Sequence, residues 1–540
     1  MTDDSIPRGK APGSPQQDQR GGTGAFLGKT PAFWRAAAGA GLAAMGMALL
    51  DVSPLAINQP GGIPAAFIAL ALFVAGPPRQ FEERTLARVG LLALFAVLLA
   101  WPLAGAAGFV PEREAAVLSL PLWGCAAALV VLGWRFRQQD PDLLMLTFVG
   151  AGVLRTVLRW GEPEFMGGEL AWWGAAIAWC LGVTLIYRRL KDHLGEERAL
   201  LGGLAWFVLL LGALTVAEMR AAPPPILKAD QRAALVMLKA KPLSGWGSGG
   251  VERAFAEYAL RPPAEAPLAA NGAFRLVGEM GMPFCALLVL LALGTFGRTI
   301  TAQPWDRARF VLLGAAGLWI AGVLAMRATP LPALVLLLFL WPGVLGCPRP
   351  PDAEMENPDL VPGHAWMGWA GGLIPALAMA VLFPAAQWHY SRQAAGYDID
   401  AASFLPGWTV PLKDRAWAIR DRSPEIAQYA DPRRKLQPVV EQWVAAAPHD
   451  EYARIEEVRW AAKTLTPQQA EAVALNAHER LPWSPEIALW LVRLKLRQGK
   501  RAEALAFLEQ LAIERAPLHI TVQARYAQLR AEVGNKSKRR

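Results

Sequence analysis

Arginines that interrupt apolar stretches are the first residues whose type and spacing point to chemistry. Arg155 lies inside the apolar segment 143–160, and Arg159 follows one helical turn later on the same face. A cation within a membrane span costs about 2.5–3.5 kcal/mol on insertion scales, so it usually faces a polar cavity. Guanidinium groups donate hydrogen bonds in pairs and stay charged, so this pattern favours the binding of phosphate oxygens.

A second explanation fits the arginines near the ends of apolar segments. Such side chains can snorkel, which means that they extend toward the lipid head groups. The arginines in question are Arg159, Arg220, Arg275 and Arg327. Arg155 lies deeper in its segment, which favours a functional role or a structural ion pair.

One carboxylate lies close to these cations in the sequence. Glu279 follows Arg275 by one helical turn in the apolar segment 274–297. Because an unpaired carboxylate is costly inside a membrane, we expect an arginine partner or a raised pKa for Glu279. The alternative role is that of a general base for an acceptor hydroxyl, and ion pairing is the favoured of the two.

A glycine-rich turn lies in the long polar segment 221–272. Residues 233–241 have the apolar spacing of a short helix, and Pro-Leu-Ser-Gly-Trp-Gly-Ser-Gly-Gly follows at 242–250. Loops longer than about 12–15 residues are usually functional or disordered. Glycines let a backbone approach a ligand closely, although ordinary turns share this composition. Trp246 in the turn is a candidate to stack on a sugar, whereas most of the 22 tryptophans fit interfacial aromatic belts.

The composition indicates that membrane helices carry these residues. The chain is 54% hydrophobic and 18% charged, against about 45–50% and about 25% in soluble proteins. We therefore predict an all-α polytopic membrane protein with eleven candidate spans. They are 35–57, 62–76, 88–110, 115–134, 143–160, 169–187, 201–220, 274–297, 310–327, 330–346 and 366–387.

Basic residues gather on alternate loops, which orients the chain. With a cytoplasmic N-terminus, the inner loops hold most of the lysines and arginines that lie between the spans. An odd number of spans then places the large loop 221–272 and the chain after residue 387 outside the cytoplasm.

The domain prediction follows from this layout. Residues 1–32, rich in Gly, Pro, Gln and charge, are expected to be a disordered cytoplasmic arm, and 33–387 to be the transmembrane domain. Residues 388–440 contain several prolines and are expected to be a connector. Residues 441–535 have the pattern of amphipathic helices, including 486–497 and 501–515.

The predicted tail has features of a tetratricopeptide-like helical repeat. Gly499, Ala504 and Leu508 have the spacing of such a hairpin, and Ala470 precedes Ala504 by the 34-residue period. A tail of this kind usually binds partners or supports the membrane domain.

Some classes of function are not favoured. The net charge of +9 is explained by topology, and no basic run interleaved with aromatics predicts nucleic-acid binding. The four cysteines lie in or beside apolar stretches without CxxC spacing, and no Asp or His motif predicts a metal or other cofactor.

The order of these motifs resembles the O-antigen ligase and O-antigen polymerase family of bacterial membrane glycosyltransferases. That family has an Arg-led helix, a P-L-x-G-x-G turn, a His-Asn pair and a Glu-x-Gly signature. Arg232, residues 242–247, Asn271 and Gly278-Glu279-Met280-Gly281 stand in the corresponding order. The resemblance covers about fifty residues closely, and Ala270 stands where the ligases have histidine.

The resemblance implies a multi-pass protein of the bacterial inner membrane with a periplasmic C-terminal domain. It would move an oligosaccharide from a polyprenyl-diphosphate donor to an acceptor hydroxyl, as in lipopolysaccharide biosynthesis. Arg232, Asn271 and Glu279 are the candidate catalytic residues, where Asn271 positions substrate and Glu279 forms an ion pair. The candidate contacts to the diphosphate are Arg155, Arg159, Arg232 and Arg275.

Two alternatives are kept. The first is a non-catalytic membrane scaffold that recruits envelope proteins through its tail, which the alanine at position 270 favours. The second alternative is a transporter. It is the weaker one, because no internal repeat of broken spans appears between the two halves of the sequence.

Overall fold

The computed structural model describes fifteen stretches of the chain. They are residues 31–50, 62–76, 96–97, 99–139, 141–160, 170–220, 228–259, 272–301, 307–325, 330–344, 369–395, 408–428, 431–514, 527–528 and 530–531. Every regular element within these stretches is a helix, and they contain no strand, which confirms the all-α prediction.

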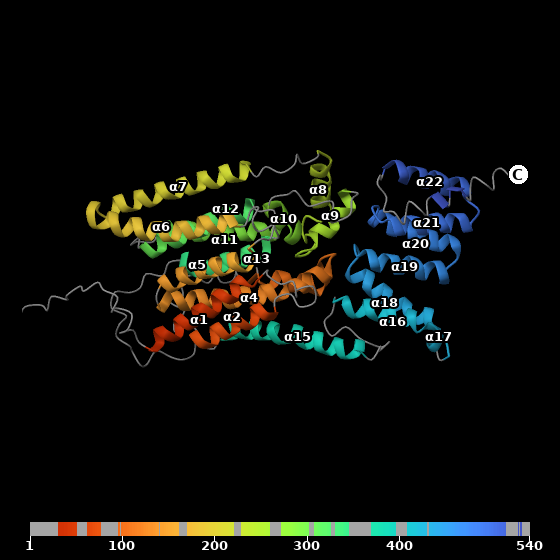
Figure 1. Cartoon of the computed structure of the whole chain (residues 1–540), viewed down its shortest axis with the longest axis horizontal. Helices are drawn as coiled ribbons and strands as arrows, with labels where there is room; N and C mark the ends of the chain where they lie inside the picture. Colours follow the sequence, from red (N-terminus) through yellow and green to blue (C-terminus); the bar gives the residue numbers. More distant parts are fainter. Residues whose placement is uncertain are drawn as a thin grey trace, which may run out of the picture.

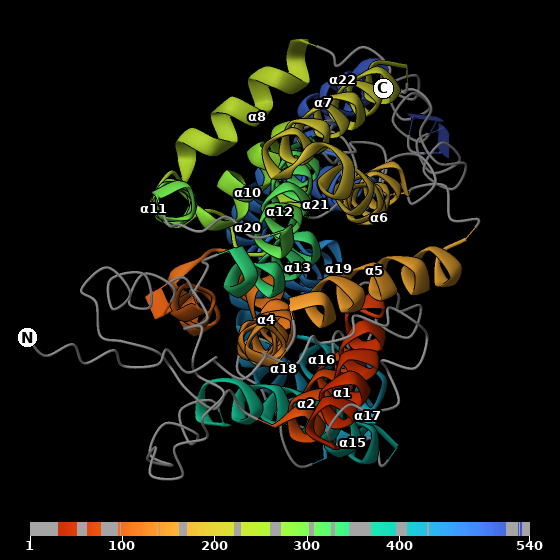
Figure 2. The same ribbon diagram turned by 90° about the vertical axis from the view of Figure 1, so that its left-hand side faces the viewer.

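The first part of the chain forms a body of long helices that run side by side (Figure 1). Seen from its end, α4 and α13 lie between α1 and α2 on one side and α10 and α12 on the other (Figure 2). Its elements are α1 (Pro31–Ala48), α2 (Gly62–Ala75), η2 (Gly105–Phe109), α4 (Arg113–Gln139), α5 (Pro141–Leu158), α6 (Leu170–Leu194), α7 (Glu196–Arg220), α11 (Met282–Thr301), α12 (Arg307–Ala325), α13 (Pro330–Val344), η5 (Trp369–Leu373) and α15 (Ile374–Ala395).

Three short helices lie at the end of this body that faces the C-terminal helices (Figure 1). They are α8 (Lys228–Ala240), α9 (Val251–Ala259) and α10 (Gly272–Met280). The C-terminal helices form the tail, which comprises α16 (Val410–Asp421), α17 (Ser423–Ile426), α18 (Pro432–Ala446), α19 (Glu451–Thr464), α20 (Pro467–Arg480), α21 (Pro485–Arg497) and α22 (Arg501–Glu514).

Small residues and aromatic rings build the core of the body. Helices α1 and α2 approach closely, and a Cβ added to Gly39 would lie 2.8 Å from that of Ala75. Close approach of this kind is typical of helices that pack through Gly and Ala. Phe148, Trp173 and Trp319 form a buried cluster in which the two indole centroids are 4.5 Å apart.

One helix in the described part of the chain, Arg113–Arg137 within α4, is long and apolar enough to cross a membrane by length and composition. Seven other apolar helices are shorter than that criterion, among them Leu170–Leu185 and Phe310–Gly322. The count of eleven spans therefore stays a prediction.

The structure differs from the predicted elements in several places. Helix α1 ends at Ala48, inside the predicted span 35–57. Residues 274–297 were expected to form one span, but the chain breaks at Gly281 into α10 and α11. Gly281 has φ +81°, a left-handed conformation that ends the helix and that glycine adopts without strain. The expected connector 388–440 contains α16, α17 and the start of α18, so the helical tail begins at Val410.

The last two predicted helices of the tail are confirmed. Helices α21 and α22 match residues 486–497 and 501–515 closely. Lys500 N donates to Lys495 O and Gly499 N to Leu496 O, and Gly499 has φ +80°. This is the glycine-terminated helix end that satisfies the last carbonyls of α21.

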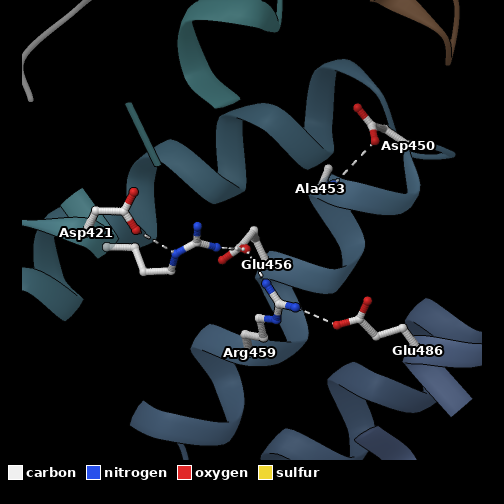
Figure 3. A network of polar contacts seen from close by, with 7 residues as sticks. Asp421, Asp450, Ala453, Glu456, Arg459 and Glu486 are labelled. Carbon is white, nitrogen blue, oxygen red and sulfur yellow. Dashed lines mark hydrogen bonds and ion pairs between the residues drawn. The ribbon is translucent and has the colours of Figure 1, made fainter. Parts of the chain in front are cut away.

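An ion-pair network links helices α16, α19 and α21 of the tail (Figure 3). The buried carboxylate of Glu456 in α19 accepts from Arg420 of α16 and from Arg459, each at 2.8 Å. Arg459 also donates to Glu486 of α21. The network therefore joins three helices through a carboxylate that is shielded from water.

Replacing Glu456 by glutamine should loosen the tail. The change weakens two charge-assisted hydrogen bonds, so we expect a loss of about 1–3 kcal/mol in local stability. The measurement is hydrogen exchange of α16, α19 and α21 in the full-length protein. The exposed pair Arg422–Glu425 supplies the control, because Glu425→Gln should change stability by less than about 1 kcal/mol. Equal effects of the two substitutions would contradict this role of Glu456.

Candidate functional site

The glycine-rich turn at 242–250 wraps around the C-terminal end of α10. Trp246 N donates to Gly278 O at 2.8 Å, and Gly247 N donates to Glu279 O at 3.0 Å. On the far side of the break, Met282 N donates to Pro242 O at 2.8 Å. The last carbonyls of a helix lack partners within it, and the turn provides them here. Two motifs that are separate in the sequence are thus hydrogen-bonded to each other.

Glycine is required at the centre of this contact. A Cβ on Gly245, which has φ +66°, would lie 2.5 Å from the carbonyl oxygen of Glu279. A Cβ on Gly281 would lie 2.2 Å from the carbonyl oxygen of Leu243. Both clashes are with backbone atoms, which cannot rotate away as side chains do. The two backbones can therefore meet only because both positions are glycine.

The other side of the turn rests on the segment just before α4. Glu112 N donates to Trp246 O at 3.2 Å, and a Cβ on Gly250 would lie 2.6 Å from the Cβ of Glu112. Trp101 donates from Nε1 to Met280 O at 2.9 Å, which adds a further contact to the end of α10. The turn is therefore held between α10 and the start of α4.

Trp246 is a core residue of this region. Only 2% of it is exposed, and its Nε1 donates to Met237 O at 3.2 Å. Its ring centroid lies 6.0 Å from that of Tyr258 and 5.7 Å from that of His449, both edge-on. We predicted a sugar contact for Trp246, but protein atoms cover the indole, so its face is not available for stacking.

The candidate arginines of α5 and α10 are buried within the body. Arg155 is 1% exposed, Arg159 8% and Arg275 6%, and Glu279 on α10 is 3% exposed. All four take part in polar or ring contacts. Snorkelling requires an exposed guanidinium group, so burial favours the alternative that these cations face the protein interior. Helices α5 and α10 both pack on α12 and α13.

The other candidate residues are only partly described. Arg232 lies on α8, but the position of its side chain is outside what the structure describes. The same holds for Arg220 on α7. Asn271, Ala270 and Arg327 lie outside the described residues.

A buried histidine that the sequence did not single out meets the glycine-rich turn. His449, in the turn between α18 and α19, contacts Glu112 through Nδ1 and Glu257 of α9 through Nε2, the latter at 2.5 Å. The side chains of His449 and Glu112 are fully buried. Three segments that are far apart in the sequence therefore meet at one imidazole ring.

A second ion pair lies beside this histidine. Arg253 of α9 donates to Glu114 Oε2 at 2.7 Å, and the hydroxyl of Thr409 donates to Oε1 of the same carboxylate. In the described stretches no group of three or more His, Cys, Asp or Glu side chains is arranged to hold a metal ion. The contacts of His449 are therefore hydrogen bonds and ion pairs.

The protein environment shifts the pKa of His449 and that of the next residue, Asp450. Burial by itself lowers the pKa of His449, but the hydrogen bonds to Glu112 and Glu257 and their charges outweigh it, so that pKa is raised. Burial and the nearby charge of Glu114 raise the pKa of Asp450. The cluster thus favours a protonated histidine.

Comparison of the chain with protein-family models, with curated proteins and with solved structures finds no match.

Proposed function

We propose that this protein is a multi-pass glycan transferase of the bacterial inner membrane, similar to O-antigen ligases and polymerases. In this proposal the body crosses the membrane eleven times, the N-terminus is cytoplasmic, and the tail is periplasmic. The donor is a polyprenyl-diphosphate-linked glycan, and the acceptor is a hydroxyl group on a second glycan, lipid or protein.

The observation that carries the proposal is the pairing of the two motifs on which the resemblance rests. The turn at 242–247 and the residues 278–281 are joined by backbone hydrogen bonds that involve Trp246, Gly247, Gly278 and Glu279. Glycines at 245 and 281 permit an approach that any side chain would block. Such close packing of two distant motifs is expected if both belong to one site.

The buried cations suggest how the reaction would be assisted. Attack of the acceptor hydroxyl oxygen on the anomeric carbon forms the new glycosidic bond and breaks the bond to the diphosphate. The diphosphate leaves with the electron pair and gains negative charge, and the hydroxyl proton passes to it or to solvent. Arginines fixed in advance stabilise such charge as it develops. Arg155 and Arg275 are held inside the body, and Arg232 is the corresponding arginine of the sequence motif.

A specific observation also favours the scaffold. The position of the ligase histidine is Ala270 in this chain. The side chain of His449, which packs against Trp246 of the glycine-rich turn, is fully buried with both ring nitrogens engaged by carboxylates, so it is not free to receive a proton from an acceptor. In the scaffold function, the tail recruits envelope proteins and the body anchors it.

The deciding experiment replaces Arg232 by alanine. In a deletion strain complemented with this variant, we expect transfer of the surface glycan to fall by about 100-fold or more, with normal protein levels. The matched control is Arg434→Ala, which removes a guanidinium whose side chain is 90% exposed on α18. If the Arg232 variant transfers glycan at the wild-type level, the transferase proposal is overturned. If glycan transfer depends on the tail alone, the scaffold function is favoured.

A further inference from the structure

We propose that His449 is a positioning residue whose protonated imidazole holds the tail against the body through two ion pairs. It fastens the tail to the start of α4 and to α9, and so holds the glycine-rich turn in place. Its effect on glycan transfer rests on the proposed function, whereas its effect on tail docking does not.

The hydrogen-bonding groups require the charged form of the ring. Nδ1 of His449 contacts Glu112 Oε1 and Nε2 contacts Glu257 Oε2. An ionised carboxylate only accepts hydrogen bonds, and a neutral imidazole has a single N–H donor. Both contacts are therefore satisfied together when the ring carries two N–H groups and a positive charge.

The charges around His449 favour this proton. The charged and titratable groups in and next to this cluster come from the start of α4, from α9 and from the tail. They are Glu112, Glu114, Arg253, Glu257, Tyr258, Asp450 and Arg480. Four of them are acids with carboxyl groups and only two are arginines, so a neutral His449 would leave an excess of buried negative charge.

The tail holds His449 rigidly. Asp450, the next residue, accepts from Trp443 Nε1 at 3.1 Å and caps α19 through contacts to Tyr452 N and Ala453 N. Arg454 donates from Nε to Pro448 O at 2.9 Å, on the other side of the histidine. The chain on both sides of His449 is therefore held within the α18–α19 turn.

The contact reaches the glycine-rich turn by two routes. The ring of His449 packs edge-on against Trp246, whose backbone N donates to Gly278 O. Glu112, the partner of Nδ1, donates from its backbone N to Trp246 O. Release of the tail would thus remove support from the turn and from the end of α10.

The direction of the pH dependence follows from linkage. The docked pKa of His449 lies above the ordinary value of about 6.5 that applies when the tail is undocked. The free energy that protonated His449 contributes to docking of the tail is fully present below the undocked pKa. It is lost as the pH rises through the docked pKa. Between the two values the docking equilibrium constant falls about tenfold per pH unit.

The experiment measures hydrogen-exchange protection factors of residues 242–259 and 431–450 in the full-length protein in lipid nanodiscs between pH 6 and pH 9. Wild-type protection should fall as the pH rises, and His449→Gln should show low protection at every pH. The control is His478→Gln, which changes a tail histidine that contacts Phe507 instead of the turn. It should follow the wild type.

A milder variant distinguishes the ion pairs of His449 from a general packing role of its ring. Glu257→Gln removes one negative charge from Nε2, so the midpoint of the pH transition should move to lower pH. Protection of the wild type that does not change with pH, or an unchanged midpoint in Glu257→Gln, would overturn the proposal.

Glycan transfer is measured on the same variants. If the wild type transfers no glycan, the proposed function fails. The exchange data still decide whether protonated His449 holds the tail in place. If the wild type is active, His449→Gln should lower transfer at least tenfold at pH 6.5. Full activity with an undocked tail would overturn the positioning role while leaving the proposed function intact.

Discussion

Replacing Gly281 by alanine is expected to prevent stable folding of the region around the glycine-rich turn. The new Cβ would lie 2.2 Å from Leu243 O and 2.8 Å from Leu243 C, and both are backbone atoms. The positive φ of +81° adds about 1–2 kcal/mol for a residue with a side chain. Relief of the clash would separate the turn from α10 and break the bond from Met282 N to Pro242 O. We expect a total loss of about 3 kcal/mol or more.

Thermal unfolding of the purified protein in detergent tests this expectation. Gly174→Ala is the matched control, because Gly174 lies within α6 with nothing within 4 Å of an added Cβ. Alanine is the better helix former, so the control should be neutral or slightly stabilising. If Gly281→Ala unfolds at the wild-type temperature, the turn and α10 are not in the contact described above.

Hydrophobicity predicted where most of the described body helices lie but not where each one ends or breaks. Each long apolar run in the described part of the chain forms a helix, because burial of such a run requires its backbone groups to be hydrogen-bonded within the segment. Residues 274–297 have a high average hydrophobicity despite Arg275 and Glu279, so a window average passes over Gly281. The break depends on the partner that caps α10, namely the turn at 242–247, and that partner is distant in the sequence.

The histidine cluster shows a second limit of sequence reasoning. Glu112, Glu257 and His449 come from three segments, and no local period or motif links them. An Asp after His449 is an ordinary helix cap, so the position carried no sign of chemistry. Only the docking of the tail on α9 and α4 brings the imidazole to the carboxylates.

The motif residues lie between these cases. The order of 242–247 and 278–281 suggested a common site, and the hydrogen bonds between Trp246, Gly247 and the end of α10 explain the glycines physically. The sequence offered a sugar contact for Trp246 beside an ordinary aromatic role, because composition does not reveal which indole faces are covered. Packing against Tyr258 and His449 decides that.

A double-mutant cycle on Arg155 and Arg275 is expected to show that the two arginines act on the same anion. Each is nearly buried, on α5 and α10, and both helices pack on α12 and α13. Charge-assisted hydrogen bonds contribute about 1.5–3 kcal/mol each, so Arg155→Gln and Arg275→Gln should each lower glycan transfer about 10- to 100-fold. If both guanidinium groups hold one diphosphate, the fold-loss of transfer in the double variant should be smaller than the product of the two single fold-losses. The difference corresponds to a coupling free energy of about 0.5–3 kcal/mol.

Arg135 provides the control for buried charge as such. It is 6% exposed in α4, and its Nε donates to Ala75 O at 3.0 Å, so it has a structural partner in the protein. Arg135→Gln combined with Arg155→Gln should give additive losses, because the two residues share no ligand. Strict additivity between Arg155 and Arg275, at unchanged protein levels, would mean that the two cations act separately. The proposed diphosphate site would then lose its physical basis, and a scaffold with independently buried arginines would explain the structure better.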